Sequence, residues 1–129
     1  MLGWFEKHNK ISWVITILTA IFIFYMSSKV FEASSYAVTW ISVVYHISVF
    51  TLLSFFLFLA LGNEKRRPIV FILGFTLAIL YGVLDELHQY FVLGRTCTIV
   101  DVGFDSLGVL LASFFYFIWI KVPKLNTKL

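Results

Sequence analysis

The fold is decided by the stretch ASSYAVTWISVVYHISVFTLLSFFLFLALGN (residues 33–63), which runs for 31 residues without an Asp, Glu, Lys or Arg. A helix of ~20 residues, at about 1.5 Å rise per residue, crosses the roughly 30 Å hydrocarbon core of a bilayer. The stretch is too short for two such helices and a connecting loop. We therefore predict one transmembrane helix here, over about residues 38–61, preceded by an interfacial lead-in.

Three further apolar runs flank this stretch, and each is long enough to span a bilayer. They cover about residues 11–28, 68–91 and 99–120. No small-residue cleavage site follows the first run, so we interpret it as a retained helix and not as a signal peptide. Pro68 is a favourable first residue for the third helix. The sequence thus predicts an all-α integral membrane bundle of four transmembrane helices.

The composition supports a membrane protein with one domain over residues 1–129. Of the 129 residues, 60% are hydrophobic and 13% are charged, and the mean hydropathy is +0.94. These values lie far from those of soluble proteins. Cys97 is the single cysteine, which excludes an internal disulfide and any zinc-finger spacing. The net charge of +3 informs topology, and we predict no binding of nucleic acid.

The basic residues fall on alternate sides of the predicted helices. The two termini and the loop between the second and third helices hold most of them, namely Lys7, Lys10, Lys65, Arg66, Arg67, Lys121, Lys124 and Lys128. The other two loops hold only Lys29 and Arg95. Lys and Arg in short loops favour the cytoplasmic side. We predict a multi-pass protein of the cell membrane whose N- and C-termini are both cytoplasmic.

Counting along the predicted helices places the polar residues in one layer near the outer face. His46 lies seven residues into the second helix and Asp105 six residues into the fourth, so each is roughly 10 Å deep. The third helix leaves the membrane core near His88. The layer contains His46, Asp85, Glu86, His88, Gln89, Arg95, Asp101 and Asp105.

Helical spacing groups these residues into faces. Asp85, His88 and Gln89 stand at positions i, i+3 and i+4, and Asp101 and Asp105 also share a face. Small residues continue both faces at the spacing that lets membrane helices approach closely. They are Gly74, Ala78 and Gly82 in the third helix, and Gly108 and Ala112 in the fourth. We therefore predict that the third and fourth helices pack together.

The acidic residues have functional and structural interpretations. A carboxylate that faces lipid costs several kcal/mol, so these acids should face the bundle interior, where function is the default hypothesis. Structurally, Arg95 could form an ion pair with Asp85 or Asp101, and Thr98 could cap the fourth helix with Asp101 in its first turn. His46 could serve helix packing alone. Asp105 is too deep for a cap and is the better functional candidate.

Metal and nucleophile signatures are weak. Histidines, carboxylates and an amide are suitable metal ligands, but no two-histidine spacing such as HExxH occurs. We predict no metal site and no cofactor. Thr96 and Ser106 carry hydroxyls near carboxylates, a combination too common to indicate a catalytic nucleophile.

The polar layer also carries an ordered motif. It reads Asp85-Glu86, Gln89-Tyr90, Gly94-Arg95, Asp101 and Asp105-Ser106-Leu107-Gly108. This order resembles the VanZ-like membrane proteins, in which an acidic pair, a Gln, an aromatic residue, a Gly-Arg turn, an Asp and a later Asn or Asp before Gly recur. Tyr25-Met26-Ser27-Ser28 and His46 resemble features of the family's first two helices. Two departures are Leu93, where Pro is common, and Ser42-Val43, where an Asp-Lys pair is common.

The resemblance implies a role in the cell envelope, because the family is named for a member that lowers susceptibility to the lipoglycopeptide teicoplanin. It marks as ligand-binding residues His46, Asp85, Glu86, Gln89, Arg95, Asp101 and Asp105.

Three hypotheses follow. In the first, an outward polar pocket binds a lipid headgroup, a lipid-linked precursor or a lipoglycopeptide. In the second, an intramembrane enzyme acts on a lipid phosphate or ester, with catalytic candidates Asp85, Glu86, His88 and Asp105. In the third, a homo-oligomer conducts protons or ions. The expected partners are membrane lipids, and self-association stays open.

Overall fold

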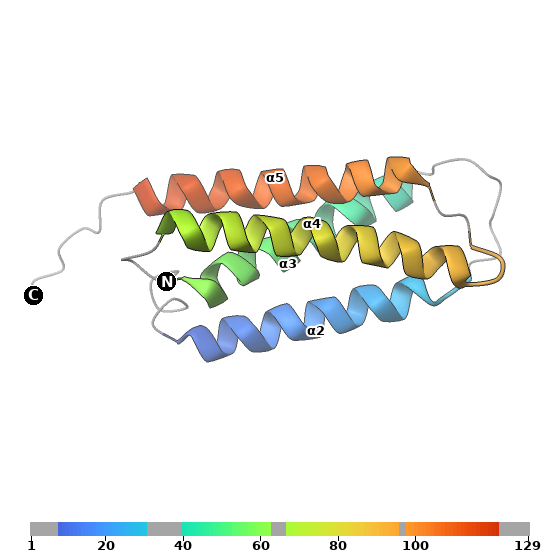
Figure 1. Ribbon diagram of the computed structural model, residues 1–129, viewed down its shortest axis with the longest axis horizontal. Coiled ribbons are helices and arrows are strands. Elements are labelled where there is room, and N and C mark those ends of the chain that lie inside the picture. The colour runs from blue at the N-terminus through green and yellow to red at the C-terminus, as the bar shows by residue number, and fades with distance from the viewer. Residues whose placement is uncertain (1–7, 31–39, 63–66, 96–97, 122–129) are drawn as a thin grey trace, which may run out of the picture.

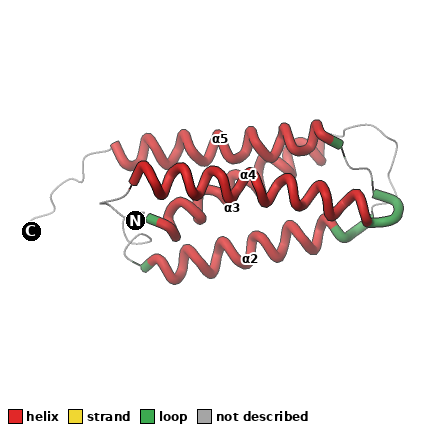
Figure 2. Tube along the Cα trace, viewed as in Figure 1, coloured by secondary structure: helices red, strands yellow, loops and turns green. Residues whose placement is uncertain are grey.

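The computed structural model describes residues 8–30, 40–62, 67–95 and 98–121. It contains four antiparallel helices that lie side by side (Figure 1). They are α2 (Asn9–Ser27), α3 (Trp40–Leu61), α4 (Arg67–Phe91) and α5 (Ile99–Lys121). Each bound lies within two residues of the predicted one. The described residues form helices and short loops with no strand (Figure 2), which confirms the all-α prediction.

Each of the four helices is long and apolar enough to cross a membrane. Large apolar side chains cover their outer surfaces, among them Leu18, Leu80 and Phe114, which are all more than half exposed. A soluble monomer rarely exposes apolar surface on this scale, whereas lipid tails cover it without penalty. The chain is therefore a multi-pass membrane protein.

The orientation of the bundle stays a prediction. Several residues on which sequence reasoning relied lie outside the described residues, namely Lys7, Lys65, Arg66, Thr96, Cys97, Lys124 and Lys128.

The interior of the bundle is apolar over much of its length. One cluster at mid-bundle includes Ile23, Phe50 and Val109, which are at most 1% exposed. A second cluster contains Phe58 and Tyr116, whose rings stack with centroids 5.2 Å apart. It lies toward the end of the bundle where α3 finishes and α4 begins. The ionisable residues buried in the described interior thus lie toward the other end.

The closest helix contact joins α3 and α5 at Gly108. A Cβ atom added to Gly108 would lie 2.6 Å from the carbonyl oxygen of Ile47, so only glycine fits here. Thr51 Oγ1 shares its proton between the carbonyl oxygens of Ile47, at 2.7 Å, and Gly108, at 3.2 Å. The small-residue face of α5 therefore packs against α3.

This contact corrects the predicted pairing of the small-residue faces. Gly74 of α4 also faces α3, since its added Cβ would lie 2.8 Å from the Phe58 ring. Gly82 alone among the described glycines of α4 faces α5, with Asp105 Oδ2 at 3.2 Å from an added Cβ. Helices α4 and α5 do pack together, as predicted. A small residue permits close approach but does not specify the partner.

Helix α2 turns a hydroxyl-bearing stripe inward. Thr16 Oγ1 donates to the Ser12 carbonyl, and Thr19 Oγ1 donates to the Ile15 carbonyl, both at 2.8 Å. These hydroxyls are thus satisfied within their own helix. A hydrogen bond of 2.6 Å from the Tyr81 hydroxyl to the Ala20 carbonyl ties α4 to α2.

Candidate functional site

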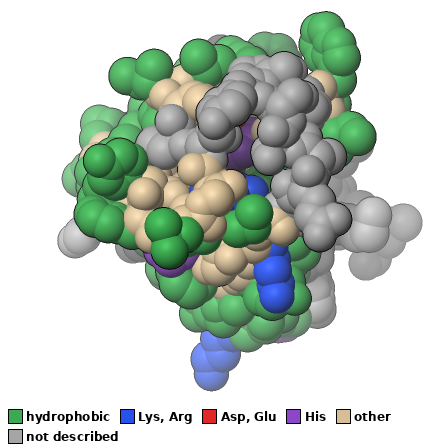
Figure 3. Space-filling view, turned by 90° about the vertical axis from the view of Figure 1, so that its right-hand side faces the viewer, with side chains coloured by type: hydrophobic (Ala, Val, Ile, Leu, Met, Phe, Trp, Pro, Cys, Tyr) green, Lys and Arg blue, Asp and Glu red, His purple; other side chains and the backbone are tan. Residues whose placement is uncertain are grey.

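Six polar side chains are buried together at one end of the bundle, where α2 and α4 finish and α3 and α5 begin. We call this the site end, and it lies at the right of Figure 1. The six are His46, Asp85, Glu86, Gln89, Asp101 and Asp105, and their exposed fractions range from 2% to 8%. Figure 3 looks onto this end, and the described residues that it shows there include no Asp or Glu side chain. We call these six buried side chains the polar cluster.

His46 and Asp105 form its deepest pair. His46 Nδ1 lies 2.8 Å from Asp105 Oδ1, which joins α3 to α5. Both side chains are buried, at 4% and 2% exposed, and a low dielectric strengthens such a bond. The other oxygen, Asp105 Oδ2, has no hydrogen-bond partner among the described residues. Counting from the helix ends predicted their equal depth, and the structure shows that they meet.

Asp85, Gln89 and Arg95 form a hydrogen-bonded chain. Gln89 Nε2 donates to Asp85 Oδ2 at 2.9 Å, which confirms the predicted shared face for these two residues. Arg95 Nη2 donates to Gln89 Oε1 at 2.8 Å, and Arg95 Nη1 donates to the Lys29 carbonyl at 3.2 Å. Gly94, with φ at +87°, adopts the left-handed conformation that starts the turn holding Arg95. Gln89 thus links the acid of α4 to the cation of the loop.

The structural alternative for Arg95, an ion pair with Asp85 or Asp101, does not form among the described residues. Among the described residues, the guanidinium bonds to an amide and a backbone carbonyl and forms no ion pair with a carboxylate. The physical reason is that Gln89 stands between Arg95 and Asp85 and bonds to both.

Glu86 and Asp101 meet at the start of α5. Thr98 N–H donates to Glu86 Oε2 at 3.3 Å, and Thr98 Oγ1 donates to Asp101 Oδ2 at 2.8 Å. The same hydroxyl accepts from Asp101 N–H at 3.3 Å, which confirms the predicted cap of the helix. The first turn of α5 is thereby fixed against α4.

His88 lies apart from the polar cluster. Its Nε2 atom is 3.0 Å from Ser28 Oγ, and its ring packs against Phe24 with centroids 4.5 Å apart. Of the catalytic candidates, His88 therefore faces α2, while the three acids belong to the cluster.

Sequence reasoning missed two cluster neighbours. Ser27 of α2 is 2% exposed and lies beside Asp85. Tyr45 packs edge-on against His46 with ring centroids 5.4 Å apart, and its buried hydroxyl has no hydrogen-bond partner among the described residues. The Tyr25-Met26-Ser27-Ser28 motif was the available signal for Ser27. Nothing in the sequence singled out Tyr45.

Two surface grooves lie away from the polar cluster. One, of about 570 Å³, is lined by residues including Pro68, Phe71 and Phe117, toward the opposite end of the bundle. The other, of about 430 Å³, runs along α3 and α5 past Leu52 and Phe115. Both have apolar walls that suit lipid chains and offer no chemistry.

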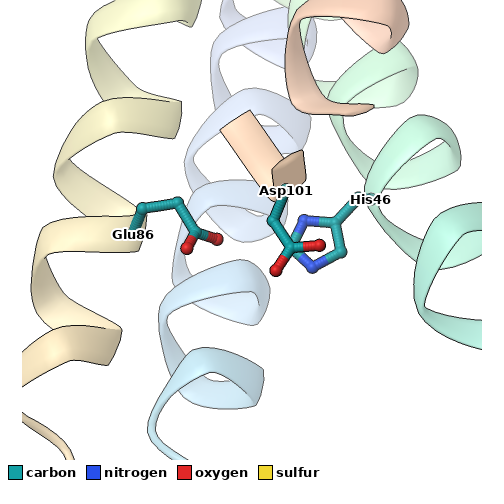
Figure 4. A group of neighbouring side chains, drawn as sticks. All are labelled: His46, Glu86 and Asp101. Atoms are coloured by element: carbon teal, nitrogen blue, oxygen red, sulfur yellow. The ribbon is translucent and has the colours of Figure 1, made fainter. Parts of the chain in front are cut away.

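One subset of the polar cluster has the composition of a metal site. His46, Glu86 and Asp101 each offer one potential ligand atom, and the three atoms all lie within 4.8 Å of one another. Figure 4 shows Glu86 from α4 and Asp101 from α5 pointing toward each other and toward the imidazole of His46 from α3.

Comparison with known proteins gives one match. A family model described as VanZ/LLP1 matches residues 7–120, a span that includes every residue of the polar cluster. No curated protein and no solved structure matches the chain.

Proposed function

The chain belongs to the VanZ/LLP1 family, and from this premise we propose that Arg95, at the rim of the polar cluster, binds a phosphate-bearing headgroup, either of a membrane lipid or of a lipid-linked envelope precursor. The proposal places the site end at the outer face of the cell membrane, as the basic loops predict. The headgroup sits at the rim of the cluster, and its acyl or isoprenyl chains lie along the apolar outer surface of the helices.

The observation that carries this proposal is the set of hydrogen-bond partners of Arg95. Its guanidinium is half-buried and oriented by Gln89 Oε1 and the Lys29 carbonyl, and it has no carboxylate partner among the described residues. Its Nε atom is buried without a hydrogen-bond partner there. A planar guanidinium held in this way is suited to phosphate, which it binds through charge-assisted hydrogen bonds. Neutral partners thus leave its charge available to an anion.

The proposal predicts that Arg95→Gln weakens the binding of phosphate lipids. In nanodiscs with a neutral background lipid, wild type should bind radiolabelled phosphatidylglycerol and a polyisoprenyl diphosphate more tightly than diacylglycerol. The loss of one charge-assisted contact of about 1.5–3 kcal/mol should weaken that binding by a factor of about 10–100. The stronger of the two phosphate probes identifies the source of the headgroup, and competition by teicoplanin tests the lipoglycopeptide.

Lys29→Gln is the matched control. It removes a cation at the same end, whose ammonium lies 4.7 Å from the centre of the Tyr25 ring, and it keeps the backbone carbonyl that orients Arg95. Its binding should stay within about twofold of wild type, since an exposed rim charge contributes little. Equal losses in both variants, or no preference of wild type for phosphate lipids, would refute the proposal.

An intramembrane hydrolase or transferase is the second candidate, because His46 and Asp105 form a histidine–carboxylate pair. In such pairs the carboxylate orients the imidazole, whose other nitrogen can move a proton. The nanodisc assay separates the two functions when the recovered lipid is examined for cleavage. If wild type cleaves the lipid and an Asp85→Asn, Glu86→Gln double variant does not, the protein is an enzyme and not only a lipid-binding protein.

Conduction of protons or ions through a single bundle is not proposed. Such a function needs a polar path between the two ends, with titratable or water-lined steps. Among the described residues, the buried interior beyond the polar cluster holds apolar side chains such as Phe50 and Phe58 and hydroxyls such as Ser54, but no Asp, Glu, His, Lys or Arg. Conduction would therefore require an assembly of several copies.

A further inference from the structure

We infer that His46, Glu86 and Asp101 form a binding site for one divalent transition-metal cation of the Zn²⁺ or Mn²⁺ class. The sequence predicted no metal site because no two-histidine spacing occurs. The structure shows that the three potential ligands come from three different helices, α3, α4 and α5, so no local spacing could reveal them.

The geometry suits a small cation. The three potential ligand atoms lie within 4.8 Å of one another, and all three side chains are more than nine-tenths buried. A tetrahedral site with bonds of about 2.0–2.2 Å places its ligands about 3.3 Å apart. Binding therefore requires the ligand atoms to move closer together, and the long Glu86 side chain, which already points toward Asp101, is the one best able to do so (Figure 4).

His46 is oriented as a metal ligand requires. Its Nδ1 atom bonds to Asp105 Oδ1 at 2.8 Å, which leaves Nε2 as the nitrogen free to ligate. The side chain is 4% exposed, and its bond to Asp105 does not involve Nε2. Histidines that bind metals usually donate their other N–H to a carboxylate, which fixes the tautomer and makes the ligand more basic. Asp105 is therefore a positioning residue for this site.

The charge of the polar cluster also favours a cation. Four acidic side chains are buried at the site end, whereas Arg95 is the single permanent cation among the described residues that bond to them or to Gln89. Buried carboxylates need protons or cations to offset the cost of leaving water. A divalent ion would offset two charges at the point where Glu86 and Asp101 meet.

The donor set indicates what such an ion would do. One imidazole nitrogen and two carboxylate oxygens leave at least one coordination position open, as in catalytic and not structural metal sites. A phosphate oxygen of the headgroup could fill that position while Arg95 binds another oxygen. This last step rests on the proposed function, whereas binding of the metal does not.

Metal analysis tests the inference. Wild type purified in detergent without chelator, and then equilibrated with Zn²⁺ alone, should hold about one equivalent by mass spectrometry. Glu86→Gln and Asp101→Asn each remove a ligand and should weaken Zn²⁺ binding by a factor of at least about 10. Asp85→Asn removes a buried acid of the same end outside the triad and should retain the metal.

A second measurement does not depend on the folding of a variant. Electron spin echo spectra of wild type loaded with Mn²⁺ should show one directly bound imidazole nitrogen. That coupling should disappear in His46→Gln and persist in His88→Gln. Less than about a tenth of an equivalent of Zn²⁺ in wild type would overturn the inference, as would Mn²⁺ binding without nitrogen coupling. Equal binding by wild type, Glu86→Gln and Asp101→Asn would also overturn it.

The two proposals fail separately. The metal assays contain no lipid, and the lipid assay can be repeated in the presence of a chelator. If metal binding fails while Arg95→Gln still weakens the binding of phosphate lipids, the headgroup proposal stands and the cation is rejected. If Zn²⁺ binds as described while the lipids show no preference, the metal site stands and the headgroup proposal is rejected.

Discussion

Asp105→Ala is expected to lower the free energy of unfolding by about 3–5 kcal/mol, because removing one partner of a buried charged or hydrogen-bonded pair leaves the other uncompensated. His46 is 4% exposed, and its Nδ1 atom would lose its 2.8 Å contact. The bond joins α3 to α5, so its loss weakens the tightest helix pair in the bundle. Denaturant titration in mixed micelles, followed by the circular dichroism of the helices, measures the change.

A double-mutant cycle isolates the pair. His46→Ala combined with Asp105→Ala should lower the free energy of unfolding by less than the sum of the two single changes. The reason is that the second change removes a contact that the first has already broken. Ser106→Ala is the matched control on the same helix. Its hydroxyl donates to the Val102 carbonyl of its own helix at 2.7 Å, so we expect Ser106→Ala to lower the free energy of unfolding by less than about 0.5 kcal/mol. Strict additivity of the His46 and Asp105 changes would show that the pair contributes nothing as a unit.

Gly108→Ala is expected to destabilise the bundle by about 1–3 kcal/mol, the usual cost of overpacking. The new methyl group would lie 2.6 Å from the Ile47 carbonyl oxygen and 3.0 Å from the Thr51 backbone nitrogen. Both are backbone atoms, which cannot rotate away, so α3 and α5 must separate. Separation also stretches the bond from Thr51 Oγ1 to the Gly108 carbonyl.

Gly103→Ala has the opposite expected sign. This glycine lies on the same helix, is exposed, and has no heavy atom within 4 Å of an added Cβ. Alanine there should stabilise α5 by about 0.5–1 kcal/mol through lower backbone entropy of the unfolded chain. Each variant adds one methyl group to the same helix. The difference between their unfolding free energies therefore reports the helix contact at Gly108. Equal changes in the free energy of unfolding for Gly103→Ala and Gly108→Ala would show that α3 and α5 do not pack closely at Gly108.

The helices could be predicted from the sequence because the bilayer imposes their length. A run without charges must satisfy its backbone internally, and ~20 residues are needed to cross the hydrocarbon core. Charged or turn-forming residues then fix the ends, as Pro68 and Thr98 do here, and the predicted bounds lie within two residues of the observed ones. Position along the bundle follows from the same count, which is why six of the eight residues of the predicted layer lie buried at one end.

The partners that residues of that layer find on other helices could not be predicted. Helix spacing gives the face on which a side chain lies but not the neighbour that the face meets. The faces of α4 and α5 were expected to meet through their small residues, yet Gly108 packs against α3 and brings Asp105 to His46. For Arg95 the sequence left a carboxylate and a lipid phosphate open as partners, and it did not indicate the contact with Gln89 that the structure shows.

The contribution of α2 was the least predictable part of the site. Its inward stripe of hydroxyls resembles an ordinary packing face, and hydroxyls in membrane helices commonly bond to their own backbone. Only tertiary contacts show that Ser27 lies beside Asp85 and that Ser28 contacts His88.

The central claim, that Arg95 binds a lipid phosphate, is tested most directly by solid-state nuclear magnetic resonance. The protein would carry nitrogen-15 in its arginine side chains, with Arg66 and Arg67 replaced by lysine so that Arg95 is the sole labelled arginine, in bilayers of phosphate-bearing lipid. Dephasing of the guanidinium nitrogen by phosphorus-31 should correspond to a separation of about 4 Å, the distance of a direct hydrogen bond to phosphate. The absence of phosphorus-31 dephasing in the folded protein would contradict the account.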